Sequence, residues 1–132
     1  MKFKDNINTW IFDLDNTLYS ADSGIFQQVH DLMGKFVSDH LNLNIDEAKK
    51  IQKKYYKQHG TTLRGMMDNH GVDPDHFLTE VHRLDYSIVE PNHKLNIELK
   101  KLEGRKIIYT NANMQHAFDV LKRIELSNFF DE

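Results

Sequence analysis

The fold of this chain is predicted most strongly by the stretch Trp10-Ile11-Phe12-Asp13-Leu14-Asp15-Asn16-Thr17-Leu18. An apolar run typical of a buried parallel strand ends at Asp13, and a second carboxylate follows at Asp15. Ligands of open parallel sheets bind at the carboxyl ends of the strands, so we expect both acids at a binding edge. Two carboxylates so close together raise each other's pKa unless a cation or a phosphate-like partner lies beside them. The alternative is a strand end followed by a polar turn, with Asp15 or Asn16 as a local cap.

Composition narrows the class of protein. The chain has 132 residues, of which 39% are hydrophobic and 28% charged, enough for one compact globular domain. The formal net charge of -3 gives no electrostatic reason to bind nucleic acid or an anionic membrane. The absence of cysteine excludes disulfides, thiol catalysis and thiolate metal sites. Because we find no signal peptide and no apolar run of ~20 residues, the length of a membrane span, we expect a cytoplasmic protein.

The hydrophobic pattern predicts two strands and a series of helices. We expect strands at residues 7–12 and 105–109, the second running into Thr110-Asn111-Ala112-Asn113. The expected helices cover residues 24–41, 44–58, 63–70, 73–84, 91–102 and 114–126. Asn44 and the Asp73-Pro74 pair are start signals for two of these helices. The predicted fold class is therefore α/β.

The string Asp13-Leu14-Asp15-Asn16-Thr17 resembles the first motif of the haloacid dehalogenase (HAD) superfamily, most of whose members are phosphatases. The resemblance implies that Asp13 attacks phosphorus and forms an aspartyl-phosphate, and that Asp15 is the general acid and base. These roles are chemically reasonable, because a metal-bound carboxylate stays ionised while its neighbour can hold a proton near neutral pH. The resemblance also implies a Mg²⁺ ion held by the Asp13 carboxylate, the Asp15 backbone carbonyl and a later acid.

The second predicted strand ends in Thr110-Asn111, which is similar to the second motif of the same superfamily. The resemblance implies that these residues bind substrate, with the Thr110 hydroxyl on a phosphoryl oxygen and backbone amides of the next helix start assisting. A helix amino terminus suits an anion, because its N–H groups lack partners and its dipole end is positive. Taken alone, the same residues describe a strand end with Asn113 as the cap of the following helix.

Nearly all residues between Thr17 and Thr110 are predicted to be helical. This arrangement is similar to superfamily members that carry a helical cap inserted after the first motif. Such a cap closes over the site and excludes water. The resemblance therefore implies a Rossmann-like parallel-sheet core in residues 1–19 and 104–132, with a helical cap in residues 20–103.

Residues 13–19, 104–112 and 56–65 resemble the pyrimidine 5'-nucleotidase branch of the superfamily. The resemblance implies that the cap turn around residues 60–64 faces the active site. There Arg64 would pair with a phosphate or stack on a base, and Thr61 or Thr62 would hydrogen-bond a base edge. The alternatives are a solvated Arg64 and a Thr62 that only caps the next helix.

Two further motifs of the superfamily, a Lys and an acidic pair, are missing and would lie beyond Glu132. A stable parallel sheet needs more than two strands, and Phe129-Phe130 resembles the lead-in to another element. We therefore expect a truncated core, its open edge covered by a homo-oligomer or another partner. We also expect these residues alone to bind Mg²⁺ weakly and to be nearly inactive.

Together these observations predict a Mg²⁺-dependent phosphomonoester hydrolase that acts on a small molecule, a pyrimidine nucleoside 5'-monophosphate. A phosphatase or phosphomutase for sugar phosphates on the same scaffold is one alternative. A truncated, non-catalytic remnant that serves as an interaction module is another.

The eight histidines and several tyrosines are not expected to take part. None of the histidines has the spacing of a helical zinc site, so we expect them at the surface. We expect Tyr19, Tyr55, Tyr56 and Tyr86 to pack with their hydroxyls in water.

Overall fold

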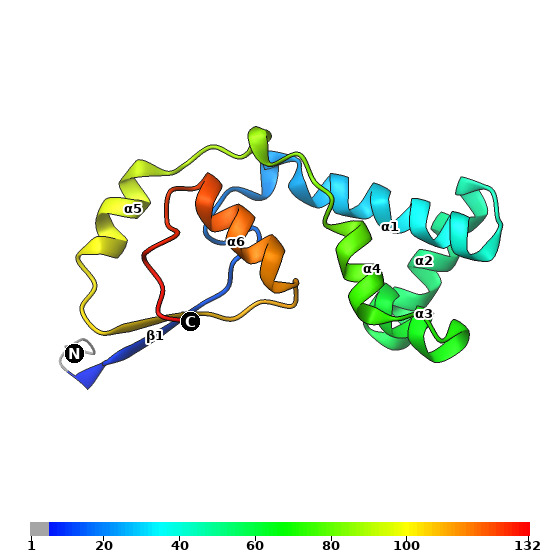
Figure 1. The fold of residues 1–132 in the computed structure, drawn as a ribbon, viewed down its shortest axis with the longest axis horizontal. Coiled ribbons are helices and arrows are strands. Elements are labelled where there is room, and N and C mark those ends of the chain that lie inside the picture. Colours follow the sequence, from blue (N-terminus) through cyan, green and yellow to red (C-terminus); the bar gives the residue numbers. More distant parts are fainter. Residues whose placement is uncertain (1–5) are drawn as a thin grey trace. The chain divides into compact units, whose positions relative to one another are not determined.

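The computed structural model describes residues 6–132 and divides the chain into two compact units (Figure 1). The first, here called the sheet unit, combines the residues up to Gly24 with Asp85–Glu132. The second, the helical unit, is Ile25–Leu84. These bounds differ from the predicted core and cap, because residues 20–24 and 85–103 belong to the sheet unit.

The sheet unit is built on two parallel strands, β1 (Thr9–Phe12) and β2 (Arg105–Ile108). Phe12 lies opposite Ile108, and the Tyr109 N–H donates to the Phe12 carbonyl oxygen at 2.9 Å. Parallel pairing brings the carboxyl ends of both strands to one edge. Both predicted strands are thus present, although each is shorter than the predicted ranges 7–12 and 105–109.

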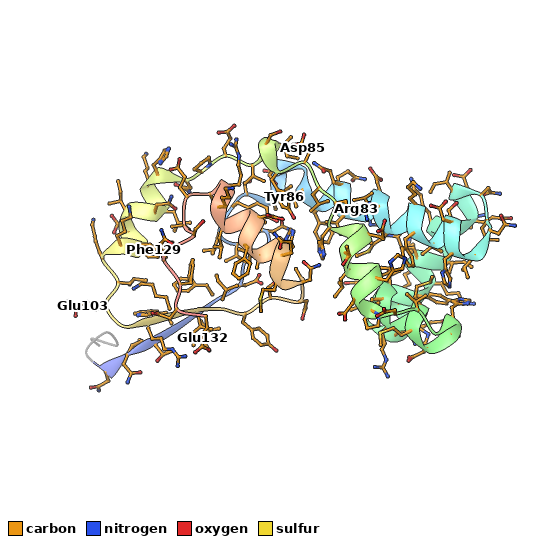
Figure 2. The ribbon with its side chains drawn as sticks, viewed as in Figure 1. Arg83, Asp85, Tyr86, Glu103, Phe129 and Glu132 are labelled. Atoms are coloured by element: carbon orange, nitrogen blue, oxygen red, sulfur yellow. The ribbon has the colours of Figure 1, made fainter. Side chains whose placement is uncertain are left out.

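β2 is also paired along its second edge, by the last residues of the chain. The Ile108 N–H donates to the Glu132 carbonyl oxygen at 2.7 Å. The Asp131 N–H donates to the Lys106 carbonyl oxygen, also at 2.7 Å. Figure 2 shows Glu132 beside the strands, and the preceding Phe130 ring packs edge-on against Phe12. The Phe129-Phe130 pair therefore leads into a short segment that hydrogen-bonds to β2.

β1 is not buried as predicted. Ile11 is 70% exposed, whereas Trp10 and Phe12, on the opposite face of the strand, are half-buried. Alternating burial is typical of a strand with only one covered face. The physical reason is the small size of the sheet, since no described residue of the sheet unit covers the Ile11 face.

Helical segments complete the sheet unit: η2 (Ala21–Ser23), η3 (Tyr86–Ile88), α5 (His93–Lys100) and α6 (Met114–Arg123). α6 begins after Asn113, whose side chain accepts a hydrogen bond from the His116 N–H at 2.8 Å. This is the geometry of a helix N-cap. α6 then buries the apolar side chains that its spacing predicts, among them Ala117, Val120 and Leu121.

The helical unit contains α1 (Ile25–Leu41), α2 (Ile45–His59), α3 (Thr62–His70) and α4 (Pro74–Val81), close to the predicted ranges. Asn44 and Asp73 cap α2 and α4 as predicted, and Thr61 caps α3. The apolar faces of the four helices form one core: Phe36, Val37, Ala48, Tyr55, Met66, Val72, Phe77 and Val81.

The chain is therefore mostly helical with a small parallel sheet, which is compatible with the predicted α/β class. A Rossmann-like core remains a prediction. No helix within residues 6–132 is both long enough and apolar enough to cross a lipid bilayer.

Candidate functional site

The loop after β1 makes a tight turn that presents two carboxylates. The Leu14 carbonyl oxygen accepts hydrogen bonds from the N–H groups of Thr17 and Leu18, and the Leu14 side chain is fully buried. Asn16 has a φ of 59°, a left-handed conformation that asparagine adopts more readily than most residues. The buried leucine anchors the turn, and Asp13 and Asp15 lie on either side of it.

Asp13 is exposed at the carboxyl end of β1. Its Oδ2 accepts a hydrogen bond from the Thr17 hydroxyl at 2.9 Å. The contact joins two residues of the quoted motif and restricts the rotation of the Asp13 side chain. An exposed carboxylate of restricted orientation suits a nucleophile or a metal ligand.

Asp15 lies in different surroundings. Its Oδ1 accepts a hydrogen bond from the Tyr19 hydroxyl at 2.6 Å and lies 2.7 Å from His116 Nε2. The Asp15 side chain is 28% exposed and the His116 side chain 1%. The second carboxylate is thus held by two neighbours, one of them 101 residues away in the chain.

His116 in turn contacts Tyr86 of η3 (Figure 2), and its Nδ1 lies 2.7 Å from the tyrosine hydroxyl. The expectation of surface histidines is therefore wrong for His116. The expectation of water-exposed hydroxyls is wrong for Tyr19 and Tyr86, and also for the buried Tyr55, whose hydroxyl lies 2.7 Å from His70 Nε2. Burial, followed by the hydrogen bond to Asp15, raises the pKa of Tyr19. Burial, followed by the charges of Asp119 and Asp15, raises the pKa of Tyr86.

The spacing of residues in the sequence could have indicated that His116 is buried. His116, Val120 and Ile124 follow one another at four-residue intervals on the predicted apolar face of the last helix. All three are buried in the structure. A titratable side chain on a buried helical stripe needs a polar partner, and that partner is Asp15.

Thr110 and Asn111 follow β2 and leave the sheet at the same edge as Asp13. The Thr110 Oγ1 accepts a hydrogen bond from the Ala112 N–H at 3.1 Å, so the hydroxyl proton points elsewhere. Asn113 caps α6, as the alternative reading of this segment predicts. The two readings are compatible, because the cap uses Asn113 and leaves Thr110 at the sheet edge.

Thr62 and Arg64, the remaining predicted site residues, belong to the helical unit. Thr62 is buried, and its hydroxyl donates to the Gln52 carbonyl oxygen at 3.1 Å. Arg64 is exposed and pairs with Asp68 one turn further along α3. The cap of α3 is Thr61 rather than Thr62. Substrate contact by Thr62 or Arg64 stays a prediction.

Two oxygen groups at the end of β1 could take part in holding a magnesium ion. Mg²⁺ prefers oxygen ligands and is commonly held by one or two carboxylates together with waters and substrate phosphates. The Asp13 carboxylate and the Asp15 backbone carbonyl are oxygens of this kind. Among the described residues, no three His, Cys, Asp or Glu side chains are grouped so that they could hold a metal ion. The residues present therefore fit Mg²⁺ in ligand type and supply only part of its coordination.

An open hollow of about 710 Å³ lies beside the loop, lined by residues 16–20 and 90–95. Asp13, Asp15 and Thr110 are absent from its lining. The hollow is therefore lined by neighbours of the two carboxylates, among them Thr17 and Tyr19, and not by the carboxylates themselves.

Comparison with known proteins finds a similar protein in yeast. The chain is 26% identical over 134 residues to "Phosphate metabolism protein 8" of Saccharomyces cerevisiae. The match covers 92% of this chain and 41% of that protein, so the chain spans about two fifths of the relative's length. No protein-family model matches the chain. The similarity is thus to a protein whose name places it in phosphate metabolism.

Proposed function

We propose that this chain belongs to a Mg²⁺-dependent phosphomonoester hydrolase of the HAD type, acting through an aspartyl-phosphate on pyrimidine nucleoside 5'-monophosphates. The observation that carries the proposal is the sheet edge: Asp13 and Asp15 follow β1 where Thr110 follows β2. The similarity to a protein named for phosphate metabolism supports the same chemistry.

In the first step, an Asp13 carboxylate oxygen attacks the phosphorus in line with the ester bond. The bond between phosphorus and the alcohol oxygen breaks, and Asp15 gives its proton to that oxygen. In the second step, Asp15 takes a proton from water while the water oxygen attacks the phosphorus. Inorganic phosphate leaves, and the Asp13 carboxylate is regenerated with Asp15 protonated again.

The surroundings of the two carboxylates suit these different tasks. Asp13 is exposed to solvent, and the hydrogen bond from the Thr17 hydroxyl restricts its orientation, which suits an attacking group. Asp15 is partly shielded and hydrogen-bonded, as a group that exchanges protons with substrate should be. Bound Mg²⁺ would offset the negative charge of Asp13 and of the phosphoryl oxygens.

Thr110 and the start of α6 would bind the phosphoryl group. Backbone N–H groups at a helix amino terminus attract anions, and Thr110 lies just before that terminus. Asn111 is exposed at the same edge and would assist.

The test is a substrate panel assayed with the full-length protein in the presence and absence of Mg²⁺. The panel contains pyrimidine and purine nucleoside monophosphates and hexose phosphates. We expect release of phosphate from pyrimidine monophosphates that depends on Mg²⁺, with slower release from the others. Absence of hydrolysis of every ester would contradict the proposal, and preference for hexose phosphates would favour the sugar-phosphate alternative.

The open side of the sheet gives specific support to a second candidate, an interaction module without catalysis. β1 pairs only with β2 in the described residues, and Ile11 is 70% exposed. Such an edge tends to pair with another chain unless it is covered. Light scattering tests this candidate, because a stable oligomer without phosphatase activity would favour it over an enzyme.

A further inference from the structure

We propose that Tyr19 and His116 are positioning residues that hold Asp15 through Oδ1, so that Oδ2 carries the proton exchanged with substrate. The inference rests on the proposed function, because it assumes that Asp15 is the general acid and base. It assigns roles to two residues and to one reacting atom that the sequence motifs left without a role.

Two short hydrogen bonds meet at one oxygen of Asp15. Tyr19 Oη lies 2.6 Å and His116 Nε2 2.7 Å from the same Asp15 Oδ1. A carboxylate oxygen that accepts two short hydrogen bonds has little capacity to carry a proton as well. The exchanged proton therefore belongs on the other oxygen of the carboxylate, Oδ2.

The ionised state of Asp15 decides the direction of each hydrogen bond. An ionised carboxylate only accepts, so Tyr19 Oη and His116 Nε2 must both donate to Oδ1. A proton on Nε2 leaves a lone pair on Nδ1 of the neutral ring, which accepts from the Tyr86 hydroxyl at 2.7 Å. A neutral phenol hydroxyl has a proton to donate, so Tyr19 can donate to Asp15 Oδ1 and Tyr86 to His116 Nδ1. The geometry thus assigns the Nε2–H tautomer to His116.

Tyr19 and His116 are held rigidly by their surroundings. The His116 side chain is 1% exposed, and its backbone N–H is bound by the cap residue Asn113. Tyr19 is 5% exposed and lies one turn beyond Asp15 in the same loop. Both donors are therefore fixed before substrate arrives, and they fix Asp15 in turn. A general acid contributes most when it is held in its reactive orientation in advance.

The first measurement needs no catalysis. Nitrogen-15 NMR of the imidazole rings in the full-length protein reports which nitrogen of His116 carries the proton. We expect a protonated Nε2 and an accepting Nδ1. Tyr86→Phe should shift mainly the Nδ1 signal, and Asp15→Asn mainly the Nε2 signal. A protonated Nδ1 with a bare Nε2 would overturn the assignment.

The second measurement compares leaving groups. An ester of a weakly acidic alcohol, such as a nucleoside monophosphate, needs a proton from Asp15, whereas 4-nitrophenyl phosphate does not. We expect His116→Leu to lower kcat/KM for the nucleotide by about 10- to 100-fold. For the nitrophenyl ester we expect kcat/KM to fall by less than about threefold. The value of kcat/KM depends only on the steps up to departure of the leaving group, and nitrophenolate departs without a proton from Asp15.

Matched variants separate positioning from damage to the fold. His116→Gln can still donate to Oδ1 and should retain most of the nucleotide activity. Tyr19→Phe keeps the buried ring, removes one donor and should show the same selective loss, to a smaller extent. His93→Leu, at a side chain 73% exposed in the same unit, should change neither ester.

The outcomes distinguish this proposal from the proposed function. If the unsubstituted protein hydrolyses neither ester, the proposed function fails and the positioning role falls with it. If the unsubstituted protein hydrolyses both and His116→Leu loses both equally, or loses neither, the positioning role alone is overturned. A selective loss on the nucleotide, rescued by glutamine, supports it.

Discussion

Asp13 and Asp15 are separated by one residue, yet they lie in different environments. Asp13 is exposed and contacts Thr17, while Asp15 is partly buried between Tyr19 and His116. Different surroundings are what allow two carboxylates of one site to take different chemical roles. The assignment of nucleophile and acid, drawn from a resemblance, therefore has a physical basis in this chain.

Substitution of the two aspartates separates their roles. Asp13→Asn removes the attacking oxygen and should lower kcat by about 10³-fold or more for every ester. Asp15→Asn removes only the exchanged proton and should cost about 10²- to 10⁴-fold on nucleotides. Steady-state rates with Mg²⁺ measure both losses. Wild-type activity in Asp13→Asn would contradict the mechanism, and unchanged thermal unfolding would show that the fold is intact.

The raised pKa of Tyr86 predicts a loss of stability at high pH. The folded state keeps the hydroxyl protonated, while the unfolded chain ionises it above pH ~10. The contribution is thus fully present below pH ~10 and is lost as the pH rises further. We expect urea unfolding of Tyr86→Phe to show a shallower decline above pH ~10 than the unsubstituted chain.

Tyr109→Phe is the control for this experiment, since Tyr109 is 74% exposed in the same unit. It should decline with pH as the unsubstituted chain does, because both contain the same lysines and the same buried tyrosines. An equal slope for all three proteins would show that folding does not raise the pKa of Tyr86.

At the scale of elements, short polar signals predicted the boundaries well. Asn44, Asp73 and Asn113 each stand at the start of a helix, and each accepts from a backbone N–H of the first turn. Such contacts depend on residues within four positions, so they can be found in the sequence. The contact between Asp15 and His116 joins residues 101 positions apart and became visible only in the folded chain.

The packing of α2 against α3 depends on Gly65. A Cβ at this position would lie 2.4 Å from the Cβ of Tyr55, which is closer than real atoms approach. Gly65→Ala should therefore destabilise the helical unit by about 1–3 kcal/mol, although alanine is the better helix former. Thermal or urea unfolding followed by circular dichroism measures the change.

Gly34→Ala is the matched control, a second helix-interior glycine of the same unit. Its Cβ would meet the Gln52 Oε1 at 3.3 Å and otherwise ordinary contacts. We expect this variant to be neutral or more stable by up to about 1 kcal/mol. Equal effects of the two substitutions would show that the close approach at Gly65 does not govern packing.

The terminal segment stabilises the sheet through Phe130. Its ring meets Phe12 edge-on with centroids 5.6 Å apart, and the next two residues hydrogen-bond to β2. Phe130→Ala should lower the free energy of unfolding of the sheet unit by about 2 kcal/mol. Phe118→Ala, at a ring 59% exposed, should cost much less. A similar loss for both would contradict the described packing.

For the whole molecule, the sequence predicted the kinds of element better than their burial. Helix periodicity and caps predicted α1–α4 because those signals are local. The apolar run of β1 predicted a buried strand, yet Ile11 is 70% exposed. Burial of a strand depends on how many strands surround it, and a local pattern does not contain that number. The same reasoning explains why the sequence did not show β2 pairing with residues 131–132.

In the candidate site too, some residues were predicted from the sequence and others were found only in the structure. The carboxylates and Thr110 were predicted from motifs, and the parallel register brings them to one edge. The residues that hold Asp15 were missed, because tyrosine and histidine have many common structural roles. The proposed positioning role is inferred only from the distances that join Asp15 to Tyr19 and His116, and His116 to Tyr86.

The central claim is that Asp13 carries the phosphoryl group during turnover, and trapping that intermediate tests it most directly. The full-length protein would be mixed with Mg²⁺ and a pyrimidine monophosphate, quenched in acid and mapped by peptide mass spectrometry. We expect a phosphate on the peptide that contains Asp13, absent from Asp13→Asn. Hydrolysis that proceeds with no phosphorylated Asp13, or with the phosphate on another residue, would contradict the account.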